Sequence, residues 1–152
     1  MGADGCADGP VVGGARSGYA ARVPYLQLDL PRAYPAEPKR RLAERFGRIY
    51  ADLMQTRPGI VKVAVRELGA DNLFRCTDGA PEPVAVISCD IRRGRSAEQR
   101  ARLAGALTAC AAEELDLTVD EIEVEFTQHA GDEMYRHGRL AAEWGPAEAA
   151  AS

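Results

Sequence analysis

The sequence has few of the features that mark metal-binding, secreted or nucleic-acid-binding proteins. Its four cysteines, Cys6, Cys76, Cys89 and Cys110, form no C-x-x-C pair and have no metal-ligand spacing. We therefore expect free thiols in a reducing, cytoplasmic setting, with no bound metal and no cofactor. The net charge of −4 leaves no basic surplus for binding nucleic acid.

Long apolar runs and a secretory signal are also lacking. No stretch approaches the roughly 18 apolar residues that a membrane span requires. The N-terminus does not have the basic-then-apolar layout of a signal peptide. We expect no membrane partner. The hydrophobic content of 46% over 152 residues suits one domain with a sizeable core.

The first 23 residues differ in composition from the rest. They are rich in Gly and Ala and show no sustained periodicity, so residues 1–23 are predicted to be a disordered leader or the product of a start assigned too far upstream. Val23 directly precedes Pro24, and a valine codon (GTG) can act as a bacterial start. The initiator would then be removed, and the mature protein would begin at Pro24. The Ala/Glu-rich residues 146–152 are predicted to be a disordered tail.

Alternating apolar residues predict the strands. Leu26, Leu28 and Leu30 have the period of two that is typical of a strand with one buried face, and Pro24 opens this strand. Further strands are predicted over residues 60–66, 84–91 and 120–127. Residues 68–83, rich in Gly, Asp, Asn and Pro, are expected to form a loop.

Two helices are predicted between these strands. In residues 36–55, apolar side chains recur at spacings of four, three and four, with mostly basic residues on the other face. The second helix begins at Ser96, which forms a capping box with Gln99. Its buried stripe consists of Leu103, Leu107 and either Cys110 or Ala111.

An internal repeat relates the two halves. Shifting the chain by 61 residues superposes 25–31 on 86–92, 35–43 on 96–104 and 59–67 on 120–128 without a gap, so that Asp29 matches Asp90. Each copy is a β-α-β unit, in which the two strands are parallel. The predicted fold is α+β: units 24–67 and 84–127 form a four-stranded mixed sheet with both helices on one face. Residues 128–145 complete a domain over 24–145. The bare second face favours self-association.

A proline that opens a β-α-β unit resembles the tautomerase superfamily, and the doubled unit in one chain resembles the cis-3-chloroacrylic acid dehalogenase group of that superfamily. The resemblance covers about residues 24–144. It is carried by Pro24-Tyr25, by Lys39 in the first helix, by Asn72-Leu73-Phe74, by Arg92-x-Gly94-Arg95-Ser96-Ala97, by the strand from Ile122 to Phe126 and by Gly138-Arg139.

The resemblance implies an enzyme that assembles as a homotrimer, with Pro24 as a catalytic secondary amine. Arg92 and Arg95 would bind the carboxylate of a small substrate. The helix histidine of the dehalogenases falls at Tyr50, their strand tyrosine at Glu125 and their water-activating glutamate near Arg136. These three residues are the substrate-binding candidates.

We therefore predict a tautomerase that moves a proton between carbons of a small 2-oxo or 2-hydroxy unsaturated carboxylate. If residues 1–23 stay attached, the Pro24 nitrogen lies in an amide bond and has no basicity. This tautomerase could have a weak hydratase or dehalogenase side activity; the alternatives to it are a non-catalytic ferredoxin-like binding module and a pseudo-enzyme on the same fold. Tyr50 is alternatively a core residue, and Glu125 part of a polar strand face. His129 and His137 are interpreted as exposed residues of the C-terminal segment.

Overall fold

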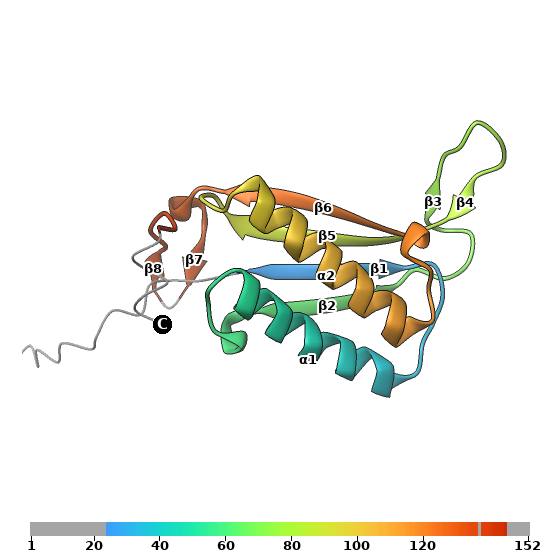
Figure 1. Ribbon diagram of the computed structural model, residues 1–152, viewed down its shortest axis with the longest axis horizontal. Coiled ribbons are helices and arrows are strands. Elements are labelled where there is room, and N and C mark those ends of the chain that lie inside the picture. Colours follow the sequence, from blue (N-terminus) through green and yellow to red (C-terminus); the bar gives the residue numbers. More distant parts are fainter. Residues whose placement is uncertain (1–23, 137, 146–152) are drawn as a thin grey trace, which may run out of the picture.

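The computed structural model describes residues 24–136 and 138–145. Four strands form one sheet in the order β2-β1-β5-β6. They are β1 (Tyr25–Leu30), β2 (Lys62–Glu67), β5 (Ala85–Arg92) and β6 (Ile122–His129). β1 is parallel to β2 and β5 to β6, whereas β1 and β5 are antiparallel. The helices α1 (Ala36–Leu53) and α2 (Ala97–Leu115) lie side by side on one face of the sheet (Figure 1). The predicted α+β fold is confirmed.

The core lies between this sheet face and the two helices. Leu26, Leu28 and Leu30 of β1 are fully buried there, because alternate side chains of a strand point to the same face. Leu42, Phe46 and Tyr50 contribute from α1, and Leu103 and Leu107 from α2. The predicted capping box at the start of α2 is confirmed: the Gln99 amide donates to Ser96 Oγ, and the Ser96 amide donates to the Gln99 side chain.

The short elements lie at the ends of the sheet. The expected loop 68–83 contains a hairpin of β3 (Phe74–Arg75) and β4 (Glu82–Pro83). A second hairpin, β7 (Tyr135–Arg136) and β8 (Arg139–Leu140), lies at the opposite end of the sheet (Figure 1). Single 3-10 turns are η1 (Pro58–Ile60), η2 (Val119–Glu121) and η3 (Gly131–Glu133).

β6 runs two residues further than the sequence predicted. His129 pairs with Arg92 in the parallel ladder, and the Arg93 amide donates to the His129 carbonyl at 2.9 Å. The interpretation of His129 as a residue of the C-terminal tail was therefore wrong, although its side chain is 34% exposed; His137 lies outside the described residues. The ladder with β5 continues to the end of that strand, and it holds His129 in place.

The second face of the sheet carries no helix (Figure 1). Tyr25, Gln27 and Asp29 of β1 lie on it in a hydrogen-bonded row, and Asp29 receives two 2.6 Å hydrogen bonds from Arg66 of β2. The predicted leader 1–23 and tail 146–152 lie outside the described residues. Within the described part of the chain, no helix is both long enough and apolar enough to cross a membrane.

Candidate active site

One end of the sheet collects most of the candidate residues. Pro24 is buried at the start of β1, where its carbonyl accepts a 3.2 Å hydrogen bond from the Lys62 amide. Since Tyr25 pairs with Asp90, this start lies beside the last residues of β5, where Arg92 ends the strand. The antiparallel β1–β5 pair thus brings together two positions that are 68 residues apart in sequence.

Arg92 and Arg95 are buried beneath the C-terminal segment. Their exposed fractions are 3% and 7%, although guanidinium groups are mostly found on protein surfaces. Arg92 Nη1 donates a short hydrogen bond to the Ala142 carbonyl. Arg95 Nη2 donates to the Met54 carbonyl at 3.4 Å, and its guanidinium carbon lies 4.4 Å from the centre of the Trp144 ring. Residues 141–144, here called the strap, therefore cover both guanidinium groups.

Tyr50 lies in α1, at the end of the core next to the two buried arginines. Its side chain is 2% exposed, and burial raises the pKa of its phenol to about 12, while the charges of Arg95 and Arg92 act to lower it. The Tyr50 carbonyl accepts a hydrogen bond from the Met54 amide, and the Met54 carbonyl accepts one from Arg95, so Tyr50 lies one helical turn from the residue that Arg95 contacts. Tyr50 therefore packs in the core, as one interpretation held, at the end of α1 that contacts Arg95.

The raised pKa of Tyr50 predicts a loss of stability in alkali. An unfolded phenol ionises near pH 10, and the buried one near pH 12. Between these values the unfolded state releases a proton that the folded state keeps, so the free energy of unfolding should fall by about 2–3 kcal/mol. Urea unfolding at a series of pH values checks this. Burial also raises the pKa of Cys89 to about 12, so both groups contribute to the loss of stability in alkali. The contribution of Tyr50 is the difference between the loss in wild type and the loss in Tyr50→Phe. If the free energy of unfolding falls equally steeply with pH in the two proteins, the prediction is contradicted.

Two glycines make room for the strap. A Cβ atom added at Gly131 would lie 2.3 Å from both the carbonyl carbon and oxygen of Ala142. One added at Gly94 would lie 2.8 Å from the Trp144 carbonyl oxygen. Further contacts hold the segment: the Gly131 amide donates to Glu143 Oε1 at 2.8 Å, and the Ala141 amide donates to the Met134 carbonyl at 2.8 Å. The strap is thus closely packed over the arginines.

We expect Gly131→Ala to displace the strap. The new methyl group would meet backbone atoms, and overpacking of this kind costs about 1–3 kcal/mol. Trp144 is the only tryptophan of the chain, so its fluorescence should shift to the red as the ring leaves Arg95. Gly105→Ala is the matched control. Gly105 lies exposed in α2 with nothing within 4 Å of an added Cβ, so this change should stabilise the protein by about 0.5–1 kcal/mol. An unshifted spectrum for Gly131→Ala would count against the close packing.

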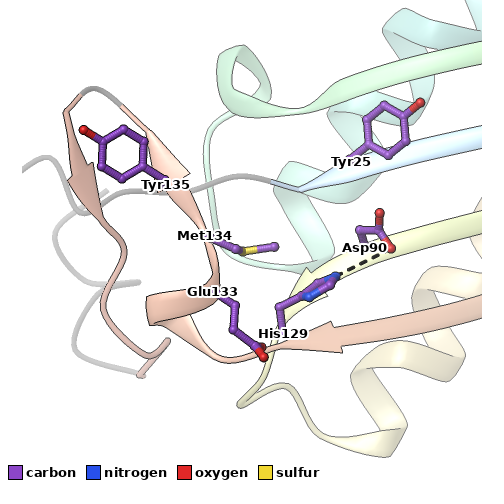
Figure 2. A pocket seen from close by; sticks show the side chains of 6 residues that line it. All are labelled: Tyr25, Asp90, His129, Glu133, Met134 and Tyr135. Carbon is purple, nitrogen blue, oxygen red and sulfur yellow. Dashed lines mark ion pairs between the residues drawn. The ribbon is translucent and has the colours of Figure 1, made fainter.

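A pocket of about 240 Å³ opens at the same end of the sheet. Figure 2 shows the side chains that line it, which come from β1, β5, β6 and the segment from η3 to β7: Tyr25, Asp90, His129, Glu133, Met134 and Tyr135. Two carboxylates, an imidazole and two tyrosine side chains line a space large enough for a small ligand, and the Tyr25 hydroxyl donates to Gln27 Oε1. The pocket therefore offers acid–base groups beside the arginine cluster.

The other two candidates stand apart from the arginines or are described only in part. Glu125 is exposed in the middle of β6 and pairs with Ser88, four residues before Arg92 and so about 13 Å from it along the strand. Arg136 lies in β7, beside the pocket residue Tyr135. A binding role for Glu125 or Arg136 stays a prediction.

Sequence reasoning did not single out Asp90 and His129 as site residues. Asp90 was noted only as the repeat partner of Asp29. A signal was present: continuing the alternation of β6 two residues past Thr127 puts His129 at the strand end that the repeat pairs with Arg92. Among the residues that the structure describes, no group of three or more His, Cys, Asp or Glu side chains could hold a metal ion.

Comparisons with known proteins place this geometry in context. Scans of protein-family models and of curated proteins gave no match. Among solved structures, the chain is similar to N1, a member of the cis-3-chloroacrylic acid dehalogenase (cis-CaaD) family, with 28% identity and a TM-score of 0.71 over 82% of this chain and 87% of N1. It is similar to native fused 4-OT, with 26% identity and a TM-score of 0.69 over 77% of this chain and 95% of the other. The F6 fused 4-OT, described as an asymmetric trimer, shares the fold at 23% identity and a TM-score of 0.69, over 77% and 95% of the two chains.

Proposed function

This chain belongs to the tautomerase superfamily, in its fused cis-CaaD-like group, and from that premise we propose that it is an isomerase. It would move a proton between carbons of a small 2-oxo or 2-hydroxy unsaturated carboxylate. The observation that carries the proposal is the pair of buried arginines at the end of β5, next to the start of β1.

The chemistry requires a base and an anion site. An α-amine has an ordinary pKa of about 7.7–8.0, and nearby cations disfavour its charged form. If Pro24 is the first residue, its nitrogen is a secondary amine and can act as a general base close to Arg92. A guanidinium group binds a carboxylate by two parallel hydrogen bonds. The arginines would hold the substrate while the amine takes its proton.

The strap fits this role of Arg92. The Ala142 carbonyl accepts a hydrogen bond from Arg92 Nη1, in the manner of a carboxylate oxygen. We propose that the substrate carboxylate takes the place of this carbonyl, which requires residues 141–144 to move away. Displacement of one acceptor by another keeps the buried guanidinium hydrogen-bonded throughout, so that its charge is never left without a partner.

We also propose a homotrimer as the working form. F6 and R7 fused 4-OT are described as trimers. The two outer strands of this chain carry opposite charges on the bare sheet face, with Lys62 and Arg66 on β2 and Glu123 and Glu125 on β6. Head-to-tail contact between such edges forms a closed ring when three copies complete one full rotation. Sedimentation equilibrium checks the assembly, and a monomer at micromolar concentration would contradict it.

An assay of proton transfer tests the proposed activity. The protein is incubated with phenylenolpyruvate and with 2-hydroxymuconate, and the change of their ultraviolet spectra is followed against the uncatalysed reaction. We expect acceleration of at least one of these ketonisations. If neither is accelerated by protein that begins at Pro24, the tautomerase assignment fails, and a binding module or pseudo-enzyme is favoured instead.

A further inference from the structure

We propose that His129, oriented by Asp90, is a second acid–base group of this site. It would act on the part of the substrate that lies away from the carboxylate. The inference rests on the proposed function, because it assigns another residue to the same proton transfer. It is carried by the position of this pair in the pocket of Figure 2.

The two side chains approach each other across neighbouring strands. His129 Nε2 lies 3.8 Å from Asp90 Oδ1, and the side chains are 34% and 39% exposed. Figure 2 shows the imidazole between Asp90 and Glu133, with the dashed line joining it to Asp90. The distance is longer than a hydrogen bond, and such contacts often tighten when a substrate binds. Both groups are thus accessible to a ligand and able to contact each other.

Asp90 is better placed than Glu133 to orient the imidazole. Glu133 Oε2 accepts a 2.7 Å hydrogen bond from the Ala130 amide, which fixes this carboxylate at the start of η3. The other titratable side chains that line the pocket are Tyr135 and Tyr25, whose hydroxyl donates to Gln27 Oε1. A carboxylate beside an imidazole sets the ring orientation and stabilises the imidazolium. Asp90 is therefore a positioning residue, and His129 is the group that would touch substrate.

The register sets the separation of the two proton-transfer groups. Pro24 precedes β1 and His129 ends β6, with only β5 between these strands. Two strand spacings are about 10 Å. A small conjugated acid can extend over most of this distance, but the two groups cannot exchange a proton directly. They would therefore act at different atoms of one substrate.

The proton transfer balances without any co-reactant. The Pro24 nitrogen takes the proton of the enol hydroxyl, and the electron pair of the O–H bond forms the carbonyl. The electron pair of the C=C bond shifts through the conjugated system and forms a C–H bond with the proton that imidazolium His129 gives up. Solvent then removes the proton from Pro24 and returns one to His129. The net change is isomerisation.

Kinetics of matched variants test the proposal. His129→Gln should lower kcat for 2-hydroxymuconate about 100-fold, which is typical for loss of a general acid, with KM within a few-fold of wild type. Asp90→Asn should lower kcat less. Added imidazole should restore activity to His129→Ala but not to Pro24→Ala. The control is His137→Gln, the same change at the only other histidine. Unchanged kcat in His129→Gln, with wild type active, would overturn the inference and leave the proposed function intact.

Chemical modification gives a readout that does not depend on turnover. Diethyl pyrocarbonate acylates accessible histidines, and mass spectrometry assigns the product to His129 or His137. Pyruvate, a 2-oxo acid that is not turned over, should slow acylation of His129 several-fold and leave His137 unaffected. If wild type is inactive, the proposed function fails by the assay alone, and absence of protection then overturns the role of His129 as well.

Discussion

A protein whose first residue is Pro24 should catalyse ketonisation of phenylenolpyruvate about 100 to 10,000 times faster than the same protein with Val23 still attached. This is the range that general-base catalysis contributes. In the longer protein the proline nitrogen belongs to an amide, which has no basic lone pair. The fold itself should be unaffected, because the first strand begins at Tyr25 and the Pro24 carbonyl, not its nitrogen, holds the hydrogen bond to Lys62.

The two forms can be prepared by specific cleavage after residue 23 and by blocking that cleavage. Their masses confirm the first residue, and circular dichroism confirms equal folding. Pro24→Ala beginning at the same position is the matched control: it keeps a free amine but a primary one, and should fall between the two. Equal activity with and without Val23 would refute the role of the Pro24 nitrogen. The mass of the protein from its natural source tells which form works in the cell.

Among the predicted changes in catalysis, loss of the Arg92 side chain should cause the second largest decrease. We expect Arg92→Ala to reduce kcat/KM for a 2-oxo acid about 100- to 1,000-fold, since the two charge-assisted hydrogen bonds to a carboxylate that are lost contribute together about 3–4 kcal/mol, the lower part of their usual range. Most of the loss should appear in KM, because the carboxylate is bound in both ground and transition states. The change also leaves the Ala142 carbonyl without its Arg92 partner, so Trp144 fluorescence should respond.

The neighbouring residue supplies the control. Arg93 is exposed, whereas Arg92 is buried. Arg93→Ala removes one positive charge from the adjacent position in the sequence, as Arg92→Ala does from its own. We expect Arg93→Ala to alter kcat/KM less than about 3-fold. Arg92→Lys should recover only part of the activity, because an ammonium group cannot form the two-point contact. If Arg92→Ala and Arg93→Ala behave alike, the effect is one of net charge and the assigned carboxylate site is wrong.

Much of the fold could be predicted because it depends on local periodicity and on the repeat. The alternation of Leu26, Leu28 and Leu30 fixes which face of β1 is buried, and the 61-residue shift forces the second unit to repeat the first. The capping box at Ser96 is likewise local, since its two hydrogen bonds join residues three apart. Boundaries were less accurate: β6 continues to His129 because β5 offers it a pairing partner as far as Arg92.

The candidate site was predictable only in part. Arg92 and Arg95 were predicted from a short motif and Tyr50 from its position in the first helix; the structure buries all three, and their roles stay predictions. The pairing of His129 with Asp90 was missed. It depends on two side chains that are 39 residues apart and meet only when β5 and β6 align in register. The hairpin β3–β4 was also missed, since its two-residue strands are too short to show a period.

The sequence by itself determined the architecture of two β-α-β units and the position of Pro24 at the head of the first strand. These follow from apolar periodicity and from a repeat that both halves must satisfy. Only the tertiary structure decided what lies around the arginines. Burial of Arg92 and Arg95 under the strap depends on the close approach of residues 141–144 to Gly94 and Gly131. Such contacts join distant parts of the chain, and their geometry is set by packing rather than by any local preference.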